Sequence, residues 1–76
     1  MLDKNIFASR IKALRLSFNV PQSTLGQVLN VSKTQISDIE NAKSTTSLER
    51  AYLLADYFDV SVDYLLGRTD NPKINN

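Results

Sequence analysis

The spacing of apolar residues along the chain predicts a series of helices. The first helix is expected from Asn5 to Phe18, where apolar side chains recur at steps of four, three and four and therefore share one face. Those side chains belong to Phe7, Ile11, Leu14 and Phe18. Asp3 or Asn5 can cap the start of this helix, and Asn19 can adopt the left-handed conformation that ends it.

The second helix is expected over residues 22–29. It follows Pro21, since proline is tolerated in the first turn of a helix. Its apolar face consists of Leu25, Val28 and Leu29. Asn30 tolerates a positive φ and so marks the end of the helix.

The third helix is expected over residues 33–41. Ser32 and Gln35 have the spacing of a capping box, in which each side chain bonds to the backbone N–H of the other residue. Ile36 and Ile39 form the face that is expected to be buried.

Each of the last two helices is preceded by a serine. Ser47 is expected to cap the fourth helix, which follows a polar loop over residues 43–46. The side chains expected to point inward from this helix are Leu48, Ala51, Leu54, Ala55 and Phe58. Ser61 is expected to cap a short fifth helix from Val62 to Leu66, which Gly67 ends.

The sequence therefore predicts one all-α domain of five helices. Seventy-six residues are too few for two domains, and only two glycines and two prolines are present, which favours helices over a turn-rich β fold. We assign residues 1–67 to the domain. Residues 68–76 are polar and contain Pro72, so we expect a frayed tail there or the start of a linker.

The composition excludes several classes of function. The chain has no cysteine and no histidine, which removes disulfides, thiol chemistry, the commonest general base and the commonest metal ligand. No nucleophile–base pair or phosphate-binding loop is visible, so we expect no enzyme, no metal and no cofactor. No apolar run approaches the roughly 18 residues of a membrane span, and residues 1–12 lack the apolar core of a signal peptide.

The second and third predicted helices carry the functional information. A joint of about three residues, 30–32, holds two helices at a steep angle in a helix-turn-helix unit. Gly26 supplies a small residue where the helices cross, and Asn30 supplies a turn residue that tolerates positive φ. Such a unit places the N-terminal end of its second helix in the major groove of DNA. The exposed face of that helix offers Lys33, Thr34, Ser37 and Asp38.

These residues resemble a known family. Residues 22–26 (QSTLG) and 31–41 (VSKTQISDIEN) are similar to the Cro/C1-type, or XRE-like, helix-turn-helix family of phage and bacterial regulators. Residues 58–67 (FDVSVDYLLG) resemble the fourth and fifth helices of that family. The resemblance implies a fold like the lambda repressor DNA-binding domain. It also implies a sequence-specific double-stranded DNA-binding regulator, a phage- or mobile-element-type repressor that binds a near-palindromic operator as a homodimer.

The resemblance further implies roles for individual residues in DNA binding. Some family positions read base edges or lie at the margin of that contact, and the matching residues here are Lys33, Thr34 and Asp38, then Ser32 and Ser37. Gln22 matches a residue that contacts a backbone phosphate, and Asn41 and Lys43 match a loop that holds the phosphate backbone. An acid at Asp38 either accepts a hydrogen bond from a cytosine amino group or pairs with a nearby cation.

Two further roles implied by the resemblance are structural. Arg15 and Glu40 match a partly buried ion pair that joins the first and third helices. The family often dimerises through its fifth helix, so its apolar residues belong either to the core alone or in part to a dimer interface. Those residues are Val62, Leu65 and Leu66.

The sequence departs from the family pattern at several positions. Pro21 stands where a capping serine or threonine is usual, so the second helix should lack a side-chain cap. Gly26 stands where alanine is usual, and a mid-helix glycine costs about 0.5–1 kcal/mol. Ala42 and Asp59 stand where glycine is usual. Because alanine fits positive φ poorly, we expect the loop after the third helix to differ in shape.

The charge distribution supports a DNA-binding function. The net charge is +1, but residues 1–43 hold six cations and three anions, whereas residues 44–76 hold three cations and five anions. The positive part contains the helix-turn-helix, as attraction to phosphate requires. We interpret Arg10 and Lys12 as solvent-exposed cations. The tyrosines are expected to serve packing rather than base stacking: Tyr52, Tyr57 and Tyr64.

A different class of function stays open at this point. Helix-turn-helix units of this family also occur as antitoxins or partner-binding subunits, which act through protein contacts. Such a protein would tolerate the replacement of Lys33 and Thr34 by glutamate, whereas a DNA-binding regulator would not. For the regulator we expect a cytoplasmic, nucleoid-associated protein.

Overall fold

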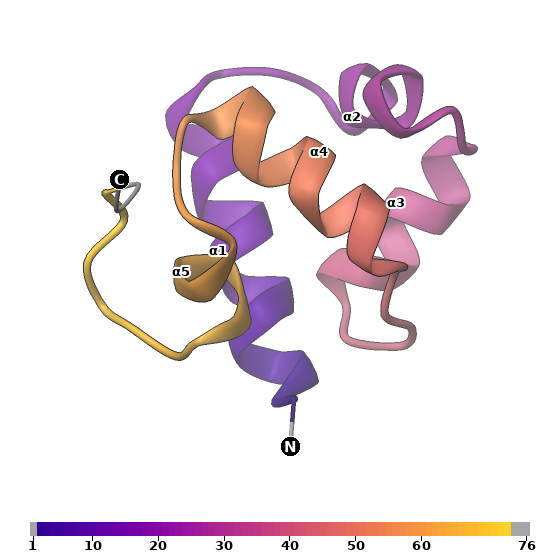
Figure 1. The fold of residues 1–76 in the computed structure, drawn as a ribbon. Coiled ribbons are helices and arrows are strands. Elements are labelled where there is room, and N and C mark those ends of the chain that lie inside the picture. Colours follow the sequence, from indigo (N-terminus) through magenta and orange to yellow (C-terminus); the bar gives the residue numbers. More distant parts are fainter. Residues whose placement is uncertain (1, 74–76) are drawn as a thin grey trace.

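The computed structural model describes residues 2–73, which fold into five α-helices joined by short loops (Figure 1). In chain order they are α1 (Lys4–Ser17), α2 (Gln22–Leu29), α3 (Lys33–Glu40), α4 (Leu48–Phe58) and α5 (Val62–Leu66). These 72 residues contain no β-strand. The predicted all-α architecture of five helices is confirmed, and α2 and α5 have the expected boundaries.

Side-chain caps start most of these helices. The Asp3 carboxylate accepts from the backbone N–H of Asn5 at 2.9 Å, so Asp3 rather than Asn5 is the cap of α1. The remaining caps are the serines predicted from the sequence, with the full capping box at α3: Ser32, Ser47 and Ser61. Pro21 gives α2 no side-chain hydrogen bond, as expected.

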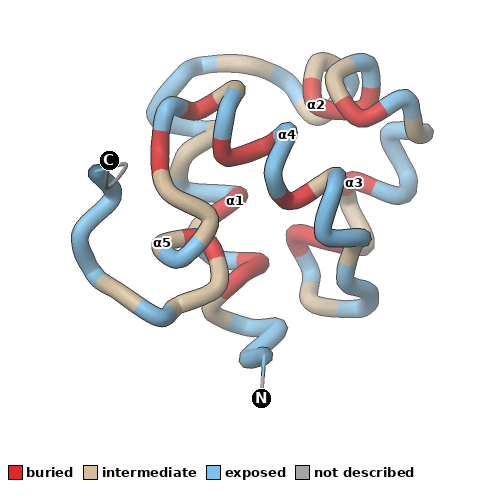
Figure 2. The backbone as a smooth tube through the Cα atoms, viewed as in Figure 1, coloured by how far each residue is buried: buried red, intermediate tan, exposed pale blue. Residues whose placement is uncertain are grey.

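The core lies where the inner faces of all five helices meet, which Figure 2 shows as the red segments. Its most deeply buried large side chains are Phe7, Ile11, Leu25, Ile36, Leu54 and Leu65. Helix α2 packs on α3 and α4, whereas α5 packs on α1 and α4. Helix α4 therefore lies between the helix-turn-helix and α5, and it separates them in space (Figure 1).

One predicted core residue is not buried. Leu48 was expected to point inward, but it is 77% exposed. It is the first residue of α4, and side chains in a helix tilt toward the N-terminus. The Leu48 side chain therefore projects past the end of the core, whereas Ala51, one turn later, is buried. Phe18 is also partly exposed, although its ring packs edge-on against Phe58 at 5.0 Å.

Within residues 2–73, four residues other than glycine have positive φ. Asn19 and Asn30 were predicted to adopt this conformation, and Ala42 and Asp59 adopt it as well, with φ of 59° and 57°. The loop after α3 was expected to differ in shape because alanine fits positive φ poorly, yet Ala42 adopts this conformation. The loop keeps its left-handed residue, which costs an L-amino acid about 1–2 kcal/mol.

The segment after α5 is not frayed over residues 68–73, contrary to the expectation. The backbone N–H of Ser61 donates to the Pro72 carbonyl at 2.9 Å. The Arg10 guanidinium donates to the Thr69 carbonyl at 2.6 Å and to the Asp70 carboxylate at 2.8 Å. The segment thus lies back against α1 and α5. Residues 74–76 of the expected tail fall outside the described residues.

Two further observations concern residues 2–73. None of the helices there is long and apolar enough to cross a membrane. That part of the chain also contains no group of three or more acidic, histidine or cysteine side chains placed to hold a metal ion.

Candidate nucleic-acid interface

The turn between α2 and α3 is built on a close backbone approach. Asn30 takes the left-handed conformation with φ 57° and ψ 46°, and Val31 then donates its N–H to the Gly26 carbonyl at 2.8 Å. A Cβ placed on Gly26 would lie 2.7 Å from the Val31 carbonyl oxygen. Gly26 therefore gives this turn the space it needs, a role that outweighs the loss of helix propensity foreseen from the sequence.

Helix α3 separates a buried face from a polar face. Ile36, Ile39 and Glu40 are buried, which fixes the rotation of the helix against α1 and α2. The outer side begins at the N-terminus with Lys33 and Thr34, both exposed. Further along, Ser37 and Asp38 are half-buried and Asn41 is exposed, so every candidate base-reading residue lies on or beside this outer face.

The start of α3 is ordered by its own side chains. The Ser32 hydroxyl accepts from the Gln35 N–H at 3.2 Å, and the Gln35 side-chain oxygen accepts from the Ser32 N–H at 3.1 Å. The exposed Lys33 lies between these two residues, beside the positive end of the helix dipole. The Lys33 charge and the positive end of the helix dipole both attract an anion, which suits a helix end that approaches phosphate.

A buried ion pair fastens α3 to α1. Arg15 and Glu40 form a two-pronged contact, with Nε to Oε2 at 2.6 Å and Nη2 to Oε1 at 3.1 Å. Their side chains are 13% and 2% exposed. Arg15 also donates to the Val20 carbonyl at 3.1 Å, so the same guanidinium holds the loop that leads into α2.

Gln22 is attached to this pair. Its side-chain Nε2 donates to Glu40 Oε1 at 3.2 Å, which orients the amide at the first residue of α2. The contact with Glu40 uses one hydrogen of the Gln22 amide. The amide oxygen is not used by this contact and remains an acceptor. This contact was not foreseen, because only the fold brings residue 22 beside residue 40.

The loop after α3 is closed by backbone bonds to Asp38. The Lys43 N–H donates to the Asp38 carbonyl at 2.9 Å, and the Ser44 N–H lies 3.4 Å from the same oxygen. Asn41 ends the helix and donates its side-chain Nδ2 to the Ser37 hydroxyl at 3.3 Å. The exposed Lys43 thus follows the outer face of α3 directly and adds a second cation near it.

Other candidate residues are placed differently from the prediction. Leu65 is fully buried, so it belongs to the core and the suggestion that it faces a second subunit is wrong. Val62 and Leu66 are half-buried and stay accessible. Arg10 was interpreted as solvent-exposed, but its side chain is only 19% exposed and lies 4.2 Å from the Tyr64 ring centre.

Sequence comparisons relate this chain to known helix-turn-helix proteins. The sequence model of the helix-turn-helix family matches residues 11–65. The uncharacterized HTH-type transcriptional regulator YobD of Bacillus subtilis (strain 168) is 30% identical over 67 residues, which is 88% of this chain and 60% of that protein. The chain thus spans less than two thirds of this curated relative.

A solved structure also resembles this fold. It is the crystal structure of the P22 c2 repressor protein in complex with synthetic operator 9T in the presence of Tl⁺. The TM-score is 0.74 and the sequence identity is 32%, over 79% of this chain and 91% of that chain.

Proposed function

The chain belongs to the Cro/C1-type helix-turn-helix family, and from this premise we propose that it is a sequence-specific, double-stranded DNA-binding regulator of the repressor type. The observation that carries the proposal is α3, whose inner face is buried while its outer side presents polar side chains. The resemblance matches these side chains to base-reading positions of the family. The likeness to the P22 c2 repressor, whose structure was determined on a synthetic operator, supports it.

In this proposal the N-terminal half of α3 enters the major groove. Lys33 donates to guanine O6 or N7, and Thr34 contacts a neighbouring base edge. Asp38 lies one turn further along the same face and accepts from a cytosine amino group. The buried Arg15–Glu40 pair holds α3 at the angle at which these side chains reach the bases.

The phosphate backbone is held on both sides of α3. Gln22 meets it from the first turn of α2, and Asn41 and Lys43 meet it from the loop after α3. Ser32 and Ser37 lie at the margin of the base contacts. Within residues 22–43, the exposed cations near α3 are Lys33 and Lys43 only. One protomer alone therefore makes few phosphate contacts and binds weakly.

We propose that two protomers bind a near-palindromic operator together. Two α3 helices then occupy successive major grooves about 34–36 Å apart. The similarity to phage regulators supports a repressor of phage or mobile-element type, and the genes beside the coding sequence provide a direct check on that origin.

The experiment is selection of binding sites from a random duplex pool, followed by fluorescence-anisotropy titration of the selected and a scrambled duplex at several salt concentrations. We expect the selected duplex to bind at least about tenfold more tightly and the affinity to fall with salt. Lys33→Ala should relax the preference at one base pair, while Lys43→Ala should weaken all sequences evenly.

The matched control is Lys12→Ala, which removes an exposed cation from α1 and should leave both titrations unchanged. Absence of any sequence preference or salt dependence in the unmodified protein refutes the proposal. Full selective binding after Lys33→Glu combined with Thr34→Glu refutes base reading by the start of α3. Tight association with a partner protein that survives this double substitution, without selective DNA binding, is the result expected of a protein-interaction module.

A further inference from the structure

The outer side of α3 carries two rows of polar side chains, because residues four apart lie one turn above one another on a helix. One row contains Lys33, Ser37 and Asn41, and the other contains Thr34 and Asp38. Ser37 is half-buried, whereas Lys33 and Asn41 are exposed. The first row therefore places a hydroxyl between a cation at the start of the helix and an amide at its end.

A hydrogen bond within this row orients the hydroxyl. Asn41 donates its side-chain Nδ2 to the Ser37 Oγ at 3.3 Å, and among residues 2–73 it is the one hydrogen-bond partner of that hydroxyl. A serine oxygen that accepts a hydrogen bond keeps its own hydrogen for another acceptor. The Lys33 ammonium, on the other side of Ser37 in the row, has donors only and cannot take this hydrogen. The Ser37 hydrogen is therefore available to a group outside the helix.

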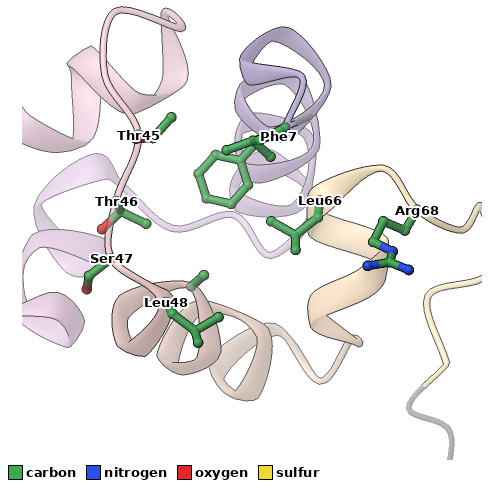
Figure 3. A pocket seen from close by; sticks show the side chains of 9 residues that line it. Phe7, Thr45, Thr46, Ser47, Leu48, Leu66 and Arg68 are labelled. Carbon is green, nitrogen blue, oxygen red and sulfur yellow. The ribbon is translucent and has the colours of Figure 1, made fainter.

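The hydroxyls that follow Asn41 in the sequence belong to a different surface. Residues 45–47 line a hollow of about 480 Å³ together with Phe7 of α1 and Leu66 of α5, and Figure 3 shows their side chains around it. Helix α4 separates α5 from α3 (Figure 1), so this hollow is not part of the outer face of α3. On the outer face, the hydroxyl beside the Asn41 amide is that of Ser37.

We propose that Asn41 is a positioning residue that fixes Ser37 as a hydrogen-bond donor to a base edge. The inference deepens the proposed function and rests on it, because α3 must lie in the major groove. Acceptors in that groove are guanine O6 and N7, adenine N7 and thymine O4, whereas the amino groups of cytosine and adenine are donors. Ser37 therefore reads an acceptor and not an amino group.

The two rows then differ in the base chemistry that they recognise. Lys33 and Ser37 both donate, whereas Asp38 in the other row accepts. Ser37 lies about 6 Å along the helix axis from Lys33, at about 1.5 Å per residue. Base pairs are about 3.4 Å apart, so in a helix that follows the groove the two donors contact base pairs about one or two steps apart. Asn41 Nδ2 has a second hydrogen, so bonding to Ser37 still leaves it a donor for phosphate.

The first measurement locates the contact. Binding-site selection with the unmodified protein and with Ser37→Ala should differ at one base pair, which is the pair that Ser37 reads. Fluorescence-anisotropy titration then uses duplexes with base analogues at that pair, which lack either one acceptor (N7, O6 or O4) or the amino group. We expect loss of the acceptor to weaken binding of the unmodified protein about three- to tenfold, the effect of one hydrogen bond, and loss of the amino group to have no effect.

Asn41→Asp is the decisive variant. A carboxylate only accepts, so the introduced side chain takes the Ser37 hydrogen and leaves Ser37 with lone pairs alone. The dependence should move from the acceptor to the amino group at the same base pair. The new charge also repels phosphate, so binding to every duplex should weaken. Lys43→Ala is the matched control, because it should weaken all duplexes evenly and keep the dependence on the acceptor.

Asn41→Ala tests whether Asn41 acts through Ser37. The hydroxyl is then free to rotate, so the dependence on the acceptor should fall at least about threefold. Combining this change with Ser37→Ala should remove no more of the dependence than Ser37→Ala alone. A larger loss in the double variant overturns Asn41 as a positioning residue. Asn41 has φ −99°, so neither substitution creates left-handed strain, and circular dichroism should show that both variants stay folded.

The outcomes separate this inference from the proposed function. If the unmodified protein binds selectively but depends on the amino group, Ser37 donates to the Asn41 amide oxygen instead, and the inference fails while the function stands. Selective binding that Ser37→Ala leaves unchanged at every base pair, or an Asn41→Asp variant that still depends on the acceptor, has the same meaning. A selection that yields no preferred site overturns the proposed function and this inference with it.

Discussion

Two arginines on α1 hold two different parts of the molecule, and their surroundings differ. Arg15 fastens the helix-turn-helix through Glu40, at 2.6 Å. Arg10 fastens the segment after α5 and meets Asp70 at 2.8 Å. The distances are nearly equal, but the Glu40 side chain is 2% exposed and the Asp70 side chain 100%. Burial rather than distance therefore decides which pair matters for stability.

The two guanidiniums also differ in what else they bind. Arg15 donates from its third nitrogen, Nη1, to the Val20 carbonyl, so most of its interaction is with one buried carboxylate. Arg10 donates to the Tyr64 and Thr69 carbonyls and packs on the Tyr64 ring. The first arrangement is an ion pair supported by one carbonyl. The second is a carbonyl clamp to which a carboxylate has been added at the surface.

The largest expected effect is that of Glu40→Ala. It leaves the Arg15 guanidinium buried without its partner, which should cost about 3–5 kcal/mol of unfolding free energy. A chain of this size is expected to have only about 4–11 kcal/mol of unfolding free energy, so the substitution should remove a large fraction of the total stability. Urea denaturation followed by circular dichroism measures the loss.

The control for Glu40→Ala removes both charges together. Arg15→Met combined with Glu40→Leu should recover most of the stability, because no charge is then stranded. If the double variant is as unstable as Glu40→Ala, the ion pair contributes through packing rather than through charge.

Arg10→Ala should have the next largest effect, about 1.5–3 kcal/mol, because it removes charge-assisted hydrogen bonds to two carbonyls. The loss should be concentrated in the segment after α5. Hydrogen exchange at the Ser61 amide, which donates to Pro72, is the measurement that reports it. Lys12→Ala, an exposed cation on the same helix, should leave that amide protected.

Gly26→Ala should destabilise the helix-turn-helix by about 1–3 kcal/mol, although alanine is the better helix former. The new Cβ would meet the Val31 carbonyl oxygen at 2.7 Å, and that oxygen belongs to the backbone of the turn. Thermal unfolding measures the change. An increase in stability would show that the turn moves aside freely. Gln27→Ala, on the exposed side of α2, is the control for the effect of an alanine in this helix.

The smallest effect is expected for Asp70→Asn. The carboxylate is fully exposed, so solvent already screens its attraction to Arg10. Stability in urea should be unchanged within error, both with and without added salt. A measurable loss would show that a fully exposed carboxylate also stabilises the fold, and that burial does not decide which of the two ion pairs matters.

Much of the fold could be predicted because its signals are local. Ser32, Ser47 and Ser61 each bond to an N–H three residues away, so the helix starts are visible in the sequence itself. The positive φ of Asn30 also follows from the chemistry of one side chain. These signals, combined with apolar periodicity, place the two helices of the helix-turn-helix without any knowledge of the tertiary structure.

The features that were missed depend on contacts between distant residues. Arg10 meets residues more than fifty positions away, and nothing near it in the sequence marks that contact. The requirement for Gly26 arises only when the turn folds back onto it. Periodicity also does not show where a helix extends past the core, which explains the error at Leu48. Nor does it show which apolar side chains of a short helix are covered, which explains the error at Leu65.

Ala42 has a consequence for how this domain can evolve. Every alanine codon becomes a glycine codon by one change at its second base, so a relaxed version of the loop after α3 is a single mutation away. That mutation would leave the core, the buried ion pair and the outer face of α3 untouched. Natural variation therefore has access to a reserve of stability at this position, which could compensate for substitutions on α3 that retune its target at some cost to folding.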